Sequence, residues 1–186
     1  MIDMKIECDV RPNRMFAPQL VGLVSSIDKK GRPNVATLTW ITTVSVDPPL
    51  ISISVGRTRY THECISSSKE FVLNLPTMDI LKEVMLAGSS SGWEGDKFEK
   101  TGLTPVESIA VKAPCVKQCA THLECKVIDM KEAGDHTIFI GKVVATMCNL
   151  EAIKDGVLDI SRIKPVLHLG GTFFTTVGEI VDSREI

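Results

Sequence analysis

Apolar and small polar residues alternate in short runs along the chain, and Gly, Pro and Asp separate these runs. The clearest run, LISISV at 50–55, alternates strictly and predicts a strand with one buried face. Other runs rich in Val, Ile and Thr predict strands at 20–27, 34–39, 71–75, 120–130, 137–149, 166–169 and 173–179. The pattern favours a mostly β domain of about six to eight antiparallel strands, closed into a barrel that leaves few open edges.

Helical patterns fall between the strands. Polar residues over 58–67 predict a first helix, and the apolar positions within 77–87 suit a second, packed helix. A helical turn is expected at 96–101, after a serine- and glycine-rich stretch at 89–95 that we expect to be mobile. Since Gly and Pro recur throughout without forming a linker, residues 1–186 are expected to form a single domain.

The charge balance is nearly neutral, with 21 basic and 23 acidic side chains and a formal net charge of −2. This balance gives no electrostatic reason to expect a nucleic-acid or anionic membrane partner. The N-terminal residues lack the ~7 to 15 apolar residues of a secretory signal, and no stretch approaches the roughly 20 needed to cross a bilayer. The sequence therefore predicts a soluble, cytoplasmic protein.

The cysteines raise the question of metal or disulfide chemistry. There are six, at positions 8, 64, 115, 119, 125 and 148, and no pair has the C-x2-C spacing of common zinc sites. Cys119 and Cys125 come nearest, but on one strand face their sulfurs would lie roughly 20 Å apart. We expect free, mostly buried thiols and no metal site.

The usual nucleotide and hydrolase motifs are absent: there is no G-x-G-x-x-G after a strand, no G-x-x-x-x-G-K-[ST], no G-x-S-x-G and no H-E-x-x-H. The segment SVGRTRYTHE at 54–63 suggests a phosphate site, because a strand ends there and a helix begins. The helix N-terminus offers free N–H groups to a phosphate, and Arg57 or Arg59 adds bidentate hydrogen bonds to it. The alternative is that Thr58 or Thr61 only caps the helix while both arginines are solvated.

The segment NVATLTW at 34–40 is a candidate ring-binding strand. It places Thr37 and Thr39 on one face, with Trp40 at its end. Hydroxyl and backbone amide groups there could pair with the edge of a heteroaromatic ring while the indole covers an apolar part. Core and cross-strand packing is an equally good interpretation of these residues.

Two histidines and one lysine stand at positions in the sequence where they could contact a ligand. His136 stands at the mouth of a strand, where it could reach a ligand or simply contact water. His168 precedes two glycines, which permit a close approach of the backbone to a ligand or to another subunit. Lys97 follows the serine and glycine loop and could swing onto a phosphate, although an isolated lysine is usually solvated.

Eight segments, taken in order, resemble the flavin reductase-like family, the FMN-binding split barrels that include flavoredoxins and archaeal ferric reductases. They are NVATLTW, DPPLISISV, GRTRYTHECI, EFVLNLP, DKFEKTGL, LEC, GDHTIFIGKV and PVLHLGG. Each segment alone is weakly specific, whereas all eight in order are specific. The resemblance covers roughly residues 15–178 and implies a six-stranded antiparallel Greek-key split β-barrel with two or three short helices. It also implies a homodimer with FMN near the subunit boundary.

The resemblance also implies roles for particular residues. Those that would line the isoalloxazine ring are Asn34, Thr37, Leu38, Thr39 and Trp40. Those that would hold the ribityl phosphate are Ser54, Arg57, Thr61 and Lys97. His136, in the pattern G-D-H-x-x-x-x-G, would lie near the reactive face, where a nicotinamide is received. A further wall would come from His168, Gly170 and Gly171.

Two functions follow from the resemblance. The first is an enzyme in which NADH or NADPH delivers a hydride to the flavin, which then reduces free flavin, ferric iron or another acceptor. His136 would position the nicotinamide nucleotide. The second is a flavoredoxin-like electron carrier that keeps FMN bound and takes electrons from a redox protein donor. Oxidation of NADH or NADPH by the purified protein distinguishes them.

Overall fold

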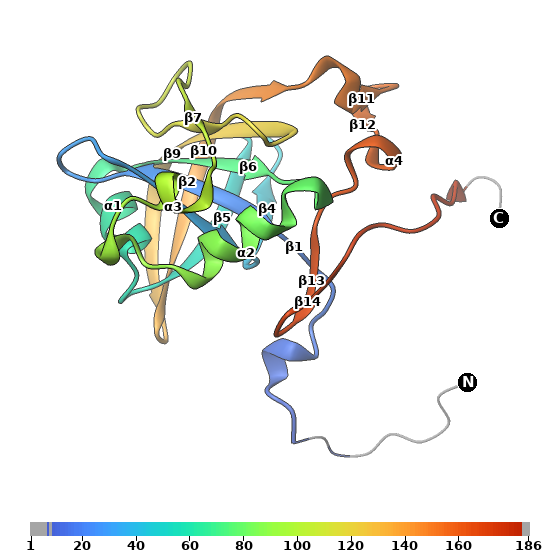
Figure 1. The fold of residues 1–186 in the computed structure, drawn as a ribbon, viewed down its shortest axis with the longest axis horizontal. Coiled ribbons are helices and arrows are strands. Elements are labelled where there is room, and N and C mark those ends of the chain that lie inside the picture. The colour runs from blue at the N-terminus through green and yellow to red at the C-terminus, as the bar shows by residue number, and fades with distance from the viewer. Residues whose placement is uncertain (1–6, 8, 184–186) are drawn as a thin grey trace.

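The computed structural model describes residues 7 and 9–183 and is built around one antiparallel sheet (Figure 1). The sheet has seven strands in the order β3-β2-β6-β9-β10-β5-β4. Their bounds are β2 Gly22–Ile27, β3 Pro33–Leu38, β4 Ile41–Ser45, β5 Leu50–Gly56, β6 Glu70–Leu75, β9 Thr121–Ala133 and β10 His136–Cys148. The expected mostly β architecture with a few helices is confirmed.

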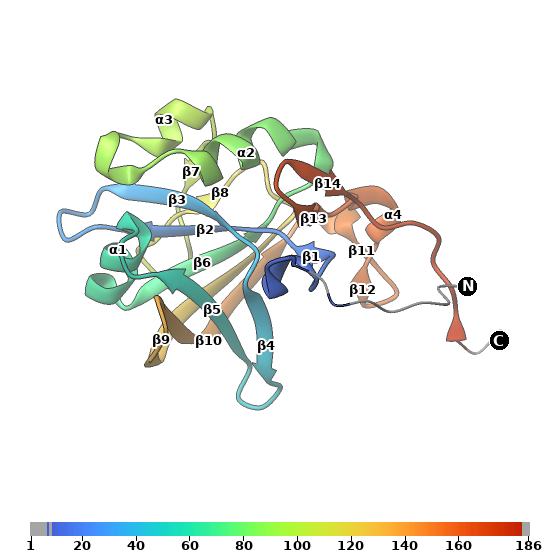
Figure 2. The ribbon, with the colours of Figure 1, turned by 90° about the horizontal axis from the view of Figure 1, so that it is seen from below.

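The two edge strands of this sheet are consecutive in the chain. Only Thr39 and Trp40 separate β3 from β4, although these strands lie at opposite ends of the strand order. Three peptide steps span at most about 11 Å, so the two edges must approach each other at this crossing. The Ser54 N–H of β5 donates to the Trp40 carbonyl at 2.9 Å, which holds the crossing against β5. The sheet is therefore strongly curled (Figure 2); Greek-key closure of six strands stays a prediction.

Three helices lie where helical patterns were expected, with boundaries shifted by a few residues: α1 Tyr60–Ser68, α2 Leu81–Ser89 and α3 Lys97–Thr101. A short helix, α4 Ile160–Ile163, was not predicted, and 3-10 turns lie at Pro12–Arg14, Met78–Ile80, Gly92–Glu94 and Leu150–Ala152. In Figure 2, α2 and α3 lie together over β3 on one side of the sheet. The predicted second helix begins as the 3-10 turn Met78–Ile80 and continues as α2.

Short strands complete the fold. A separate three-stranded sheet has the order β1-β13-β14, and two further pairs join β7 to β8 and β11 to β12. Their bounds are β1 Gln19–Leu20, β7 Pro105–Val106, β8 Cys115–Val116, β11 Ile153–Lys154, β12 Val157–Leu158, β13 Leu167–Gly170 and β14 Phe173–Thr175. The strand predicted at 173–179 is thus shorter than expected, and β4 was not predicted because no turn residue separates it from β3.

The core consists of two main apolar clusters on opposite faces of β2. Val24 belongs to the cluster inside the curled sheet, with Ile53, Phe71 and Phe139. Leu23 belongs to the cluster under α2 and α3. Because both faces of β2 are covered, all six of its residues are buried, including Ser25 and Ser26. Because β2 is buried on both faces and pairs with β3, it holds β3 and the crossing residues Thr39 and Trp40 in place.

Gly141 of β10 is packed too closely to accept a side chain. A Cβ at this position would lie 2.7 Å from two ring carbons of Phe71 and 2.9 Å from the Cβ of Cys125. We expect Gly141→Ala to lower the free energy of unfolding by about 1–3 kcal/mol, since the core must shift to admit the methyl group. Denaturant unfolding measures this change. Gly178→Ala is the matched control, because a Cβ there meets nothing within 4 Å; an equal loss in both variants would contradict the packing argument.

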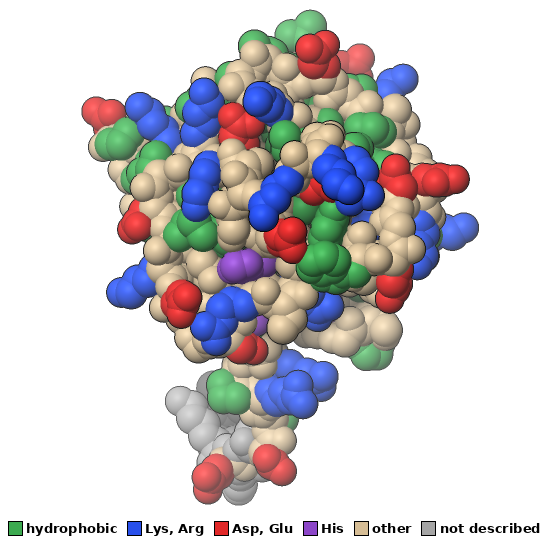
Figure 3. Space-filling view, turned by 90° about the vertical axis from the view of Figure 1, so that its left-hand side faces the viewer, with side chains coloured by type: hydrophobic (Ala, Val, Ile, Leu, Met, Phe, Trp, Pro, Cys, Tyr) green, Lys and Arg blue, Asp and Glu red, His purple; other side chains and the backbone are tan. Residues whose placement is uncertain are grey.

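No helix among the described residues is long and apolar enough to cross a membrane. The face shown in Figure 3 carries Lys and Arg side chains interspersed with Asp and Glu, and a histidine is visible near its centre. That face therefore presents no extended surface of a single charge. The N-terminal segment that contains Pro12–Arg14 extends away from the curled sheet, on the side of the β13–β14 hairpin (Figure 1).

Candidate functional site

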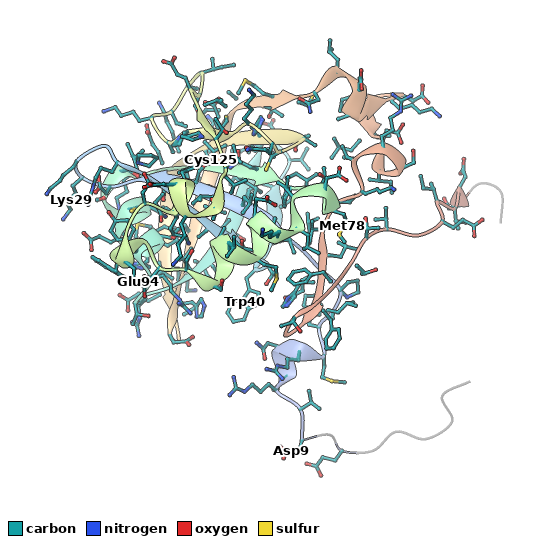
Figure 4. The ribbon with its side chains drawn as sticks, viewed as in Figure 1. Asp9, Lys29, Trp40, Met78, Glu94 and Cys125 are labelled. Atoms are coloured by element: carbon teal, nitrogen blue, oxygen red, sulfur yellow. The ribbon has the colours of Figure 1, made fainter. Side chains whose placement is uncertain are left out.

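A cavity of about 460 Å³ opens where the chain crosses between the two sheet edges. Its volume lies within the range of roughly 300–1,000 Å³ that is typical of small-molecule sites. Residues 36–40, 54–56, 59–61, 84–85, 87–92, 97, 136, 168, 171 and 174 line it. The crossing, the N-terminus of α1, the C-terminal half of α2 and the β13–β14 hairpin thus meet around one space. Trp40, labelled in Figure 4, projects from the underside of the sheet in that view, beside α2.

Most of the residues predicted from the sequence lie together in this cavity. The predicted residues that line it are Thr37, Leu38, Thr39, Trp40, Ser54, Thr61, Lys97, His136 and His168. They come from segments up to 131 positions apart in the chain, from 37 to 168. Their roles toward a ligand stay predictions, but their placement around a common space agrees with a single binding site.

Lys97 places a buried positive charge at one end of the cavity. The residue is only 4 % exposed, and its Nζ donates to the Ala87 carbonyl at 2.6 Å. Burial, together with the smaller effects of the positive charges of Arg59 and Lys100, lowers the pKa of Lys97 to about 8. No Asp or Glu lines the cavity, and none among the described residues forms an ion pair with Lys97. This end of the cavity is therefore suited to an anion.

The N-terminus of α1 lies at the same end. Arg59 is the N-cap residue of α1, and no side chain caps the helix. Arg59, Tyr60 and Thr61 all line the cavity, so the positive end of the helix dipole and its free N–H groups are available to a ligand. The structure thus brings together a helix N-terminus, a guanidinium and an ammonium group, as a phosphate site requires.

Arg57 does not line the cavity, so its assignment to the phosphate stays a prediction that this cavity does not support. Its guanidinium forms an ion pair with Glu132 at 3.1 Å, and its N–H donates to the Asp135 carbonyl. The turn after β5 directs Arg57 toward the β9–β10 hairpin, whereas Arg59, two residues later, lines the cavity. The direction in which a side chain points just after a strand depends on the conformation of the following turn. The sequence pattern did not specify the conformation of this turn.

Asn34 lies behind the cavity wall rather than in it, so its assignment to the ring stays a prediction that this cavity does not support. Its side chain is buried and donates to the Thr61 Oγ1 at 3.0 Å and to the Ser26 Oγ at 3.2 Å. Its Oδ1 is buried without a hydrogen-bond partner. Asn34 therefore orients the hydroxyl of Thr61, which lines the cavity in the first turn of α1.

Trp40 and His136 pack together on another part of the cavity wall, and His136 adjoins Arg59 across Gly56. Their ring centroids are 4.6 Å apart, with the planes tilted by 38°. The Nδ1 of His136 lies 2.7 Å from the Asp135 carboxylate, and this hydrogen bond lowers the pKa of Asp135. With Nδ1 engaged, Nε2 is the nitrogen left to face Gly56, on the cavity wall. The pair provides an aromatic surface with one polar atom beside it.

The β13–β14 hairpin also lines the cavity. His168 packs against Phe174 with ring centroids 4.9 Å apart, and its Nε2 lies 3.1 Å from the Gly171 carbonyl. Gly170 and Gly171 both have positive φ, of 120° and 60°, which an L side chain rarely adopts. Gly171 lines the cavity, whereas Gly170 does not. The two glycines form a tight turn beside the cavity, and the close approach of their backbone to a ligand or to another subunit stays a prediction.

The loop after α2 forms a wall that the sequence analysis did not assign to the site. Residues 89–92 line the cavity, and Ser90 Oγ donates to the Leu86 carbonyl at 2.6 Å. The face of α2 that carries Val84, Ala87 and Gly88 continues this wall. These positions follow the i, i+3, i+4 spacing of one helix face, which is the signal that could have identified them. The mobility expected of this loop stays a prediction.

Gly92 is held tightly between two site residues. A Cβ there would lie 2.2 Å from Tyr60 Cδ1 and 2.8 Å from Asn34 Oδ1. We expect Gly92→Ala to displace the loop at 89–92. Because this loop and Lys97 line the same cavity, the substitution should weaken binding of a phosphate-bearing ligand such as FMN roughly tenfold. Fluorescence titration of the apoprotein measures the affinity. Gly178→Ala serves as control; unchanged FMN affinity in Gly92→Ala would show that the loop does not shape the site.

Thiol and metal chemistry find little structural support. Among the described residues, no three His, Cys, Asp or Glu side chains are grouped so that they could hold a metal ion. The five described cysteines are free, and all except Cys148 are buried. Burial raises the pKa of Cys64 to about 11 and that of Cys125 to about 12, so neither is an activated thiolate. Cys8 lies outside the described residues.

The fold and cavity define a mostly β protein whose main cavity is suited to a small ligand with an aromatic part and an anionic part. The sequence profile of the flavin reductase like domain matches residues 14–176, and the chain belongs to this family. The family places the chain among flavin-related oxidoreductases.

Known proteins of similar sequence and structure agree with this assignment. An uncharacterized protein of Archaeoglobus fulgidus is 43% identical over 155 residues, covering 83% of this chain and 85% of the relative. Among solved structures, flavoredoxin of Desulfovibrio vulgaris has a TM-score of 0.87 at 30% identity, with 97% of each chain covered. Flavoredoxin from Methanosarcina acetivorans has a TM-score of 0.85 at 28% identity, covering 98% of this chain and 95% of its own.

Proposed function

We propose that the chain binds FMN, with the phosphate at Lys97, Arg59 and the α1 N-terminus and the isoalloxazine ring against Trp40. One observation carries this proposal: the buried Lys97 ammonium has no carboxylate partner among the described residues, although an uncompensated buried charge is costly. A phosphate would supply the missing negative charge. The names of the two flavoredoxins and the family's description support a flavin as the ligand.

The ring end of the cavity suits the tricyclic part of FMN. Thr37 Oγ1 donates to the Val84 carbonyl at 2.5 Å and thereby fixes β3 against α2, so the wall of the cavity is preformed. Trp40 supplies an apolar face, and the backbone of residues 38–40 at the crossing offers polar groups to the ring edge. When bound, FMN supplies the redox chemistry, and the protein supplies binding and orientation.

We further propose that the protein is an NAD(P)H-dependent oxidoreductase that passes a hydride through bound flavin to a second acceptor. His136 would orient the nicotinamide through Nε2, because Asp135 holds Nδ1 and fixes the ring against Trp40. His136 thus has a free nitrogen at the cavity wall and a fixed orientation. Its position beside the proposed ring site supports this role.

An electron carrier is the second candidate function. Similarity to two flavoredoxins along nearly the whole chain favours it. In this case FMN would stay bound and a redox protein would deliver the electrons, so His136 would contribute no nucleotide contact. The same cavity serves both candidates, and only the donor differs.

Anaerobic absorbance between about 300 and 600 nm separates the two candidates. The purified protein, reconstituted with FMN, is measured before and after addition of NADH and then NADPH. Bleaching of the flavin bands by either nucleotide supports the reductase. Flavin bands unchanged by both nucleotides support the carrier, and failure to take up FMN would overturn the FMN proposal itself.

We also propose that two copies pair as a homodimer near this site. A second groove, between the N-terminal segment and the sheet, is lined by Phe16, Pro18, Leu20, Trp40, Ile41 and Ile138, among others. Phe16 is 79 % exposed and Phe173 is 72 % exposed, which is unusual for large apolar side chains. The family resemblance supports a second copy as the occupant. Light scattering after size exclusion, with Phe16→Glu as the variant expected to weaken pairing, tests this.

A further inference from the structure

A smaller, strongly basic cavity adjoins the ring end of the main cavity. Its volume is about 240 Å³, and four residues line both cavities: Thr39, Trp40, His168 and Gly171. A ligand in the smaller cavity would therefore lie directly beside a ring held by Trp40. In Figure 4 the N-terminal segment, which includes the labelled Asp9, lies on the same side of the molecule as Trp40.

The charged residues of this smaller cavity come from one turn of the chain. Arg11 and Arg14 line it, and they are joined by the 3-10 turn Pro12–Arg14, in which the Arg14 N–H donates to the Arg11 carbonyl at 2.9 Å. Neither guanidinium forms an ion pair with a carboxylate in the part of the chain that the structure describes. No Asp or Glu lines the cavity, and Asn13 and Gln19 add neutral polar groups. Two unpaired guanidinium groups in a polar cavity favour an anion with more than one charge.

This basic cavity is separate from the phosphate end of the main one. Lys97 and Arg59 line the main cavity only, and Arg11 and Arg14 line the smaller cavity only. FMN carries a single phosphate group. If the Lys97 end holds that phosphate, the exposed guanidinium groups of Arg11 and Arg14 remain available to a second anionic molecule on the other side of Trp40.

We infer that Arg11 and Arg14 bind the pyrophosphate of the nicotinamide dinucleotide that reduces the flavin. This inference rests on the proposed function and identifies which residues select its donor. A dinucleotide held there by its phosphates could extend past Trp40 and His168 into the main cavity, where His136 would meet the nicotinamide. The guanidinium groups match the planar, bidentate geometry of phosphate oxygens.

Equilibrium binding tests the inference without relying on turnover. Calorimetric titration of the FMN-loaded protein uses oxidised NAD, oxidised NADP and inorganic pyrophosphate as separate probes. The double variant Arg11→Ala/Arg14→Ala is expected to raise the Kd of the dinucleotides and of pyrophosphate about tenfold or more, since it removes the charge-assisted hydrogen bonds to the phosphate oxygens. The Kd of FMN should change by less than about twofold.

The matched control is Lys29→Ala/Lys30→Ala, which removes the same charge from the exposed β2–β3 turn, away from both cavities. Its dinucleotide affinity should stay at the wild-type value. Equal weakening in both double variants, or none in the arginine variant, would overturn the inference. Loss of pyrophosphate binding without any effect on the dinucleotides would overturn the dinucleotide as the ligand. Failure to bind FMN is a different result, because it contradicts the proposed function and not the arginine site.

Discussion

Replacing Lys97 by methionine is expected to raise the Kd for FMN about 10- to 150-fold, because one charged hydrogen bond to phosphate is worth roughly 1.5–3 kcal/mol. Methionine keeps much of the volume of the buried side chain and removes only the ammonium group. Lys97 is 4 % exposed, so water cannot replace the lost charge easily. Titration of the apoprotein with FMN, followed by fluorescence quenching, measures the affinity.

The same lysine makes FMN affinity depend on pH. Its pKa is lowered to about 8 in the absence of a ligand, so the group loses its proton as the pH rises through 8. A phosphate favours the charged form, so binding above pH 8 requires proton uptake. The Kd of the wild-type protein should therefore rise by up to about tenfold per pH unit above pH 8. The Lys97→Met protein should lack this dependence.

Lys100→Met is the matched control for this experiment. Lys100 lies one turn further along, is 53% exposed at its side chain and does not line the cavity. Its substitution should change FMN affinity by less than about twofold at about pH 7, where Lys97 is already charged. Thermal melts of the two apoproteins separate weakened binding from unfolding. Wild-type affinity in a folded Lys97→Met protein would show that the phosphate is not held at Lys97.

Replacing His136 by alanine is expected to lower kcat/KM for NAD(P)H oxidation about tenfold or more, while FMN affinity changes less than about threefold. The reason is geometric: His136 contributes one ring beside Trp40, whereas the buried Lys97 ammonium is held by the Ala87 carbonyl and, among the described residues, forms no hydrogen bond with His136. Steady-state oxidation of NADH and NADPH, together with FMN titration, gives both quantities.

Arg57→Ala is the comparison variant for His136. Arg57 forms an ion pair with Glu132 at the hairpin near His136 but does not line the cavity, so both quantities should stay near the wild-type value. Equal losses of FMN affinity and turnover in His136→Ala would contradict a role toward the nicotinamide. A large loss of FMN affinity in Arg57→Ala would support the assignment of that arginine to the phosphate.

The sequence by itself determined the positions of most of the longer strands and the order of the family segments, because both depend on local patterns, although it missed β4. The alternation of LISISV is a property of neighbouring residues and predicted β5 within one residue. Similarly, 120–130 and 137–149 predicted the long hairpin of β9 and β10. Nine residues that line the cavity could be predicted from the sequence, because each of them lies in one of the segments that resemble the family.

Only the tertiary structure decided where side chains near strand ends point and which charges are buried. The turn after β5 directs Arg59 into the cavity and Arg57 out of it, although both follow the same strand. Lys97 is buried because α3 packs beside α2, a contact that no local pattern encodes. The meeting of the two sheet edges at Thr39 and Trp40 depends on strands distant in sequence. Local periodicity determines the elements, whereas the site arises from contacts between them, which depend on the whole folded chain.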